Sequence, residues 1–256
     1  MLTKEFINMS LGEFVAKYPS SRKVFDQFNL DYCCGGAQTI HSAIKENKIE
    51  IDQLFNALKE HLETIKTREP HESIIWTDKT LTELANHIEE NHHTFMKKKM
   101  PYVKMFLTKL EEVHGKRYSD TLTPLKQTFE KLKKEIEKHL WDEENVLFPY
   151  LKQLEASKQK GFTHPYEPAF TVNDVISLME EEHDNAGEAL RKMRMLTDNY
   201  TLPEDACKTW QLAYEELQAI EDDLHKHVHK ENSILFPQVL NMIKTNQNGG
   251  CICTMK

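Results

Sequence analysis

The chain contains two copies of one pattern of histidine and glutamate. Residues 139–149 read HLWDEENVLFP and residues 227–237 read HVHKENSILFP, so both fit H-x-x-x-E-x-x-x-L-F-P without a gap. A spacing of four residues on a helix stacks the two side chains one turn apart on the same face. Imidazole nitrogens and carboxylate oxygens are common metal ligands. The repeat therefore predicts a metal site that contains His139, Glu143, His227 and Glu231.

Both pairs lie in the apolar stripe of a predicted helix. The first stripe advances by alternating steps of four and three through Leu125, Phe129, Leu132, Ile136, His139, Glu143, Val146 and Tyr150. The second has the same rhythm through Ala213, Leu217, Ile220, Leu224, His227, Glu231 and Ile234. An unpaired buried carboxylate costs on the order of several kcal/mol. A bound cation would offset this cost, so the pattern favours metal binding over a pair of surface charges.

Two further helices each supply a histidine. His183 is in phase with the apolar stripe of its helix, whereas the first long helix leaves two choices. Leu81, Leu84 and Ile88 lead to His92, but Met96, Met100 and Val103 lead back to His93. The similarity of LTELANHIEENHH (81–93) to VNDVISLMEEEHD (172–184) pairs His92 with His183.

Four histidines and two glutamates suit two metal ions. Glu143 and Glu231 would bridge the ions, each ion would take two imidazoles, and open positions would remain for a small ligand. Nitrogen and oxygen ligands in a helical bundle favour iron, with manganese as the alternative. Other charged groups near the pattern are expected to face solvent or, at most, to support the ligands; they are Asp142, Glu144, Glu181, Glu182, His225 and His229.

Long helices must position these side chains. Glycine (8 residues) and proline (9 residues) are sparse, and apolar residues recur at helical spacing over about 79–113, 121–155, 171–197 and 203–244. The first two helices resemble the last two, so the chain is predicted to be all-α, with two hairpins packed as an antiparallel four-helix bundle. Pro149 and Pro237 predict a kink or an early helix end.

The chain divides into four predicted parts. A small helical domain covers 1–62, a linker 63–78, the bundle 79–244 and a flexible tail 245–256. In the first domain Cys33 and Cys34 precede two glycines and a helix expected to start near Ala37, and a helix N-terminus favours the thiolate. They are interpreted as an exposed, reactive dithiol, or alternatively as two small buried residues at a turn. Cys251 and Cys253 in the tail have no assigned role.

Composition limits the classes of function. The 256 residues carry a net charge of −8, which argues against nucleic-acid binding. No apolar stretch of about 18 residues predicts a membrane helix, and the N-terminus lacks a secretory pattern. A cytoplasmic location is expected, where the five cysteines would serve as thiols rather than as a disulfide framework.

The combined motifs resemble a known family. LDYCCGGAQTI (30–40), the repeated H-x-x-x-E-x-x-x-L-F-P and EHDNAGE (182–188) are similar to the repair-of-iron-centres proteins of the ScdA and YtfE type. The resemblance covers about residues 8–240. It implies an N-terminal ScdA-type domain joined to a hemerythrin-like bundle with two non-haem irons. Matched position by position, it implies the cysteine pair Cys33 and Cys34 and the metal ligands His93 (rather than His92), His139, Glu143, His183, His227 and Glu231.

The expected function is repair of iron–sulfur clusters damaged by nitrosative and oxidative stress, by supplying iron or removing nitric oxide. Expected partners are damaged iron–sulfur proteins, nitric oxide or O2 as small ligands, and a second copy of the chain. The alternatives are a hemerythrin-like O2 or NO binding module and a di-iron NO or peroxide reductase. No flavin or nicotinamide motif is present to feed electrons, so a repair protein or iron donor is favoured over a turnover enzyme. The sequence leaves open the clients, the fate of the iron and the oligomeric state.

Overall fold

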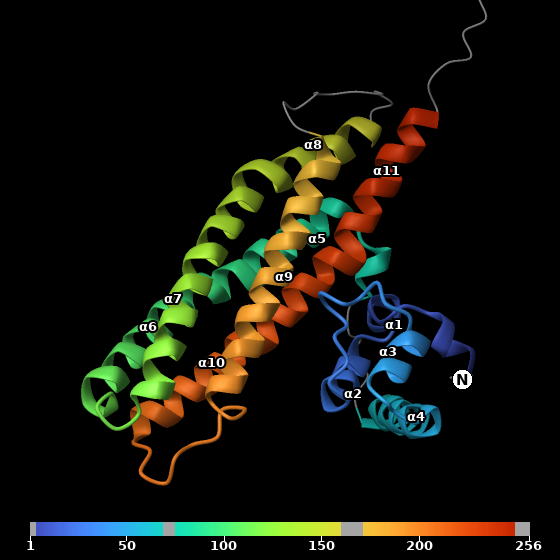
Figure 1. The fold of residues 1–256 in the computed structure, drawn as a ribbon. Coiled ribbons are helices and arrows are strands. Elements are labelled where there is room, and N and C mark those ends of the chain that lie inside the picture. Colours follow the sequence, from blue (N-terminus) through green and yellow to red (C-terminus); the bar gives the residue numbers. More distant parts are fainter. Residues whose placement is uncertain (1–3, 69–74, 160–170, 249–256) are drawn as a thin grey trace, which may run out of the picture. The chain divides into compact units, whose positions relative to one another are not determined.

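A computed structural model describes residues 4–68, 75–159 and 171–248 (Figure 1). Within these ranges the structure is helical, and the only β pairing is an isolated bridge between Ser10 and Thr39. The all-α prediction is therefore confirmed. The chain forms two compact units, one of residues 1–84 and 228–256 and the other of residues 85–227. No helix in the described ranges is long and apolar enough to cross a membrane.

The first unit contains short helices from the N-terminal part and the last helical segments of the chain. They are η1 (Lys4–Asn8), α1 (Leu11–Lys17), η2 (Pro19–Ser21), α2 (Arg22–Gln27), α3 (Ile40–Glu46), α4 (Ile51–Arg68), η3 (Trp76–Asp78), η6 (Glu231–Leu235) and α11 (Phe236–Asn248). Ser10 caps α1: its hydroxyl accepts from the Glu13 N–H while the Glu13 carboxylate accepts from the Ser10 N–H. Thr39 caps α3 through the Ser42 N–H. These caps fix where two of the short helices begin.

The second unit is a bundle of long helices. Its elements are η4 (Ile88–His93), α6 (Thr94–His114), α7 (Ser119–Asp142), η5 (Glu143–Leu147), α8 (Phe148–Gln159) and α9 (Val172–Leu196). α5 (Leu81–His87) and α10 (Lys208–Lys230) each have residues in both units. α7 packs against both α6 and α9; a short connection reverses the chain between α6 and α7, and a longer loop reverses it between α9 and α10 (Figure 1). The predicted antiparallel helical bundle is present.

The predicted apolar stripes form the core of the bundle. Leu125, Phe129 and Leu132 of α7 are completely buried, and Ile176 and Met179 of α9 are nearly so. Each such side chain contributes roughly 1.5–3 kcal/mol when it leaves water. This burial stabilises the helices that carry the candidate ligands.

Three π-helical turns, η4, η5 and η6, interrupt the long helices. Proline lacks an N–H and its ring clashes with the carbonyl four residues earlier. The residue before each proline instead bonds five residues back: the Phe148 N–H to the Glu143 carbonyl, and the Phe236 N–H to the Glu231 carbonyl. Of the two predicted alternatives, a kink or an early helix end, the early end does not occur at Pro149 or Pro237, because a wider turn precedes each proline and the helix continues beyond it.

The extra residue of a π turn also shifts the buried face. After Glu143 the stripe was predicted to continue through Val146 and Tyr150. Both are only half-buried, whereas Leu147 and Leu151, one residue further along, are 1% and 0% exposed. The prediction assumed a constant α-helical period, which fails where the helix widens.

His229, in the first unit, was expected to face solvent or, at most, to support the ligands, and it does not face solvent. Its ring is buried and makes an edge contact with the ring of Tyr32, at 5.7 Å between centroids. Burial lowers the pKa of His229 from 6.5 to about 4. Its location in the core of the first unit follows from packing against the cysteine-bearing loop, which helical periodicity does not report.

The pKa of His229 predicts an acid-sensitive stability. Because the unfolded chain binds this proton near pH 6.5 and the folded chain only near pH 4, stability should fall as pH drops through this window, by at most about 3 kcal/mol. His229→Phe should retain the apolar contact and flatten the curve. Urea unfolding at pH 7 and pH 4.5 measures the difference, and equal pH dependence in both proteins would contradict the assignment.

Candidate metal centre

The π turns lie where the candidate ligands lie. η4 carries His92 and His93, η5 begins with Glu143, and η6 begins with Glu231. In a π turn, residues five apart share a face, which puts His93 in register with Ile88. The two conflicting apolar series of the first long helix are thus both buried, and the phase break between them was the sequence signal of the π turn.

Glu143 lies among three imidazoles in the bundle. Its Oε2 atom is 3.2 Å from His93 Nε2, 3.5 Å from His139 Nε2 and 3.7 Å from His227 Nε2. Glu143, His93 and His227 are fully buried and His139 is 2% exposed. Four helical elements, η4, α7, η5 and α10, therefore bring one carboxylate and three ring nitrogens together in a buried space.

His183 joins this cluster from α9. Its Nε2 atom is 3.2 Å from His139 Nε2, and both rings are buried. Two nitrogens that each lie about 2.1 Å from one shared ion have a separation of this size. The pair is consistent with two imidazoles that bind the same cation.

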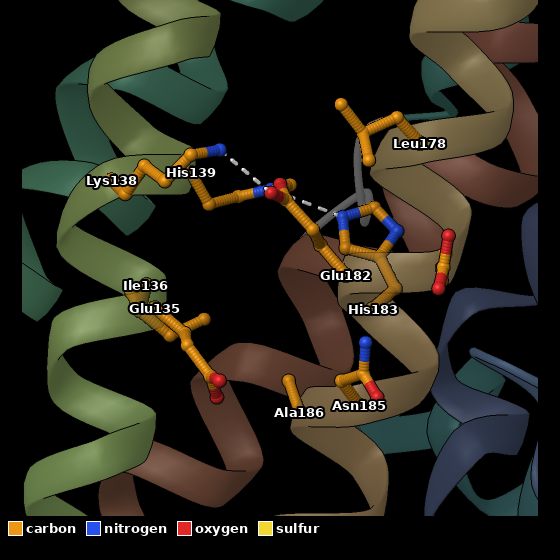
Figure 2. Close-up of a pocket in the computed structure, with 10 residues that line it drawn as sticks. Glu135, Ile136, Lys138, His139, Leu178, Glu182, His183, Asn185 and Ala186 are labelled. Atoms are coloured by element: carbon orange, nitrogen blue, oxygen red, sulfur yellow. Dashed lines mark hydrogen bonds and ion pairs between the residues drawn. The ribbon is translucent and has the colours of Figure 1, made fainter.

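Carboxylates at the edge of the cluster orient two of the rings. His139 Nδ1 is 2.8 Å from Glu182, and His93 Nδ1 is 2.8 Å from Glu144, so the Nε2 atom of each ring points inward. Figure 2 shows Glu182 reaching the His139 ring beside Lys138, with which it forms an ion pair. The hydrogen bond from His139, together with Lys138, lowers the pKa of Glu182 to about 2. Of the groups expected at most to support the ligands, Glu144 and Glu182 do so.

Removal of such an orienting group should weaken metal binding without removing a ligand. We expect Glu182→Ala to lower iron affinity by roughly 10–100-fold, because His139 loses the acceptor that fixes its ring. Glu181→Ala, at the exposed neighbouring position, is the matched control. Competition with a chromogenic chelator measures both, and equal affinities would show that Glu182 does not position His139.

The two histidines of η4 have different surroundings. His93 approaches Glu143, whereas His92 Nδ1 lies 3.0 Å from Asp223 of α10. His92 is also buried, and its ring is parallel to that of His227 at 5.6 Å. This arrangement supports His93 as the ligand and gives His92 a separate acidic partner.

Glu231 continues the helix that carries His227. Lys230, the last residue of α10, has helical backbone angles, so Glu231 follows His227 by one turn of an unbroken helix. The Glu231 side chain is fully buried. Both predicted His–Glu pairs are therefore helical and buried.

The donor set fits a metal ion. Within the described part of the chain, neither carboxylate oxygen of Glu143 has a hydrogen-bond donor, and His93 Nε2 has no hydrogen-bond partner. Burial of these lone pairs without a partner destabilises the fold unless a cation binds to them. Neutral imidazoles and an anionic carboxylate in a helical bundle suit iron or manganese.

The cysteine pair lies in the loop between α2 and α3. Cys33 is 5% exposed and Cys34 is half-buried, and α3 begins at Ile40 rather than near Ala37. A hydrogen bond with Cys34 and burial raise the pKa of Cys33 well above its usual value. The expectation of an exposed thiolate at a helix N-terminus is therefore wrong for Cys33. Cys251 and Cys253 lie outside the described residues.

The fold and the buried His–Glu cluster together define a hemerythrin-type cation-binding helical protein. Comparison with family models agrees: residues 85–239 match the hemerythrin HHE cation binding domain, and residues 7–62 match the ScdA_N domain, described as a domain of unknown function.

Curated relatives narrow the class further. Iron–sulfur cluster repair protein YtfE of Yersinia pseudotuberculosis serotype IB (strain PB1/+) is 34% identical over 236 residues, which cover 92% of this chain and 98% of the relative. The proteins of the same name from Yersinia pestis strains Pestoides F and Nepal516 match to the same extent. The chain belongs to this family of iron–sulfur cluster repair proteins, as the sequence motifs predict.

Proposed function

We propose that this protein repairs damaged iron–sulfur clusters and that its bundle holds two non-haem irons. His93, His139, His183 and His227 would bind the irons, and Glu143 and Glu231 would bridge them. The observation that carries the proposal is the buried carboxylate of Glu143, which faces three imidazoles and has no hydrogen-bond donor in the described part of the chain. Membership of the repair family supports the biological role.

The residues of this chain have separable tasks. Glu143 supplies negative charge to the centre, and Glu144 and Glu182 hold the rings of His93 and His139 in position. Buried apolar side chains around the cluster exclude water and so strengthen electrostatic interactions within it. Iron bound there would supply an exchangeable cation and a redox centre.

A pocket gives small molecules a route to the ligands. It has a volume of about 260 Å³, lies between α7 and α9, and includes His139 and His183 in its lining (Figure 2). Nitric oxide, O2 or a hydrated ion would fit within this volume. The pocket favours a second candidate function, in which the bundle binds or reduces NO, O2 or peroxide without a repair role.

Partners and location follow from the proposed chemistry. Damaged iron–sulfur proteins are the expected clients, and nitric oxide or O2 the expected small ligands. Cys33, Cys34 and Cys207 form no disulfide in the described part of the chain, and thiols persist in reducing compartments, so we propose a cytoplasmic location. Sedimentation of the purified protein will test the proposed homodimer.

The decisive experiment combines metal analysis with a repair assay. Anaerobically reconstituted protein should contain about two irons per chain with a di-iron Mössbauer signature. It should restore activity to a purified iron–sulfur enzyme that nitric oxide has inactivated. Bound zinc without iron would contradict the centre. Iron loading without restored activity would favour the binding module, and sustained turnover of NO with an added electron donor would favour the reductase.

A further inference from the structure

A second group of metal-ligating side chains lies in the first unit, in the loop between α2 and α3. Asp31, Cys33 and Cys34 each offer one ligand atom, and these atoms all lie within 4.8 Å of one another. The group consists of a carboxylate and two thiols, so its chemistry differs from that of the His–Glu cluster. Asp31 is exposed and Cys34 is half-buried, which leaves the group accessible from solvent.

The carboxylate is held toward the thiols before any metal binds. Asp31 Oδ1 accepts hydrogen bonds from the backbone N–H of Cys33 at 3.2 Å and of Cys34 at 3.0 Å. The Cys33 thiol donates to the same oxygen at 3.2 Å. A proton therefore already lies between sulfur and oxygen, where a cation could replace it.

Neighbouring residues keep the loop in this conformation. A Cβ atom on Gly35 would lie 2.8 Å from the Asp31 carbonyl oxygen, and one on Gly36 would lie 2.6 Å from the Tyr32 carbonyl oxygen. Larger residues at either position would push the loop open. Asn232 of η6 also donates its side-chain amide to the Cys33 carbonyl at 3.3 Å. The three candidate ligands therefore lie on a turn that is already held in one conformation, so less conformational entropy is lost when a metal binds.

We propose that Asp31, Cys33 and Cys34 form a separate binding site for a divalent cation of intermediate softness, Fe2+ or Zn2+. Two thiolates and one carboxylate provide three ligands, so a fourth position remains open to water or to an incoming group. Binding replaces two thiol protons, which are released to solvent, with one doubly charged ion. The affinity should therefore rise with pH.

This site would give the cysteine pair a role in handling iron. Asn232, which contacts the cysteine loop, directly follows Glu231 in η6. The segment that carries a proposed ligand of the two-iron centre is therefore packed against the thiol site. The choice of iron as the natural occupant rests on the proposed function, whereas the existence of the site does not.

Cobalt(II) is a suitable probe, because thiolate ligands give it an intense charge-transfer absorption that imidazole and carboxylate ligands do not. The full chain is titrated with Co2+ under a non-thiol reductant, in a Cys251→Ser/Cys253→Ser background. We expect a charge-transfer band that saturates at about one equivalent. Cys33→Ser/Cys34→Ser and Cys34→Ser alone should remove or greatly reduce it, and Asp31→Asn should weaken the affinity at least about tenfold.

Cys207→Ser is the matched control and should leave the band unchanged, since this free thiol lies elsewhere. Circular dichroism and the iron content of the bundle show that each variant has folded. Absence of the band, or its persistence in Cys33→Ser/Cys34→Ser, would overturn the proposal. Because the His–Glu cluster has no thiolate, a protein that shows the band but holds no iron in the bundle would contradict the proposed function alone.

Discussion

Glu143→Gln should make the metal-free protein more stable and the iron-loaded protein less stable. Without metal, the Glu143 carboxylate is a fully buried group with no hydrogen-bond donor in the described part of the chain. Replacement of this buried carboxylate by a neutral amide of nearly the same shape should raise the free energy of unfolding, by on the order of 1 kcal/mol, because a neutral group costs less to bury than a charged one. With iron, the same change removes an anionic ligand, so the stabilisation that binding confers should shrink.

The loss of bound iron, and of the stability that iron confers, can be measured directly. We expect wild-type protein to retain about two irons per chain and Glu143→Ala/Glu231→Ala to lose most of them, because two helices then lack their carboxylate ligands. Urea unfolding with and without iron, together with metal analysis, measures both effects. Glu137→Gln, at an exposed site of the same helix α7, is the control and should change neither quantity.

A gain in stability in both metal states would mean that Glu143 is not a ligand. A loss in both states would mean that it has an ordinary structural role.

His93→Ala should weaken iron binding far more than His92→Ala. His93 lies 3.2 Å from Glu143 and is oriented by Glu144, whereas His92 lies 3.0 Å from Asp223. Loss of a ligand should exceed the roughly 10–100-fold cost of losing an orienting group. His92→Ala should stay within that smaller range.

Both histidines are buried, so each substitution leaves a cavity of similar size and the pair forms its own control. Iron titration and Mössbauer spectra of the two variants provide the measurement. If His92→Ala lost the metal and His93→Ala kept it, His92 rather than His93 would be the ligand on η4. Equal losses would indicate that the variants act through folding, which circular dichroism would reveal.

Sequence periodicity was sufficient for the helical architecture and for the buried positions of most candidate ligands. The phase of His139, His183 and His227 with buried leucines and methionines predicted which faces meet, because a helix buries one face whatever its partners are. The repeated His–Glu pairs also located the two carboxylates. Residue type and spacing carry this information, and both are local.

The tertiary structure decided the details that depend on hydrogen-bond register and on distant contacts. Periodicity signalled the π turn only at His93, through a break in phase; because it assumes one helical pitch, it could not show that the π turns at Glu143 and Glu231 add a residue and shift the face. Nor could it show that His229 lies against Tyr32, or that Cys33 is buried beside Asp31. The contact of His229 with Tyr32 joins segments far apart in the sequence, whereas the bond between Cys33 and Asp31 depends on the local conformation of the loop, which hydrophobic periodicity does not report.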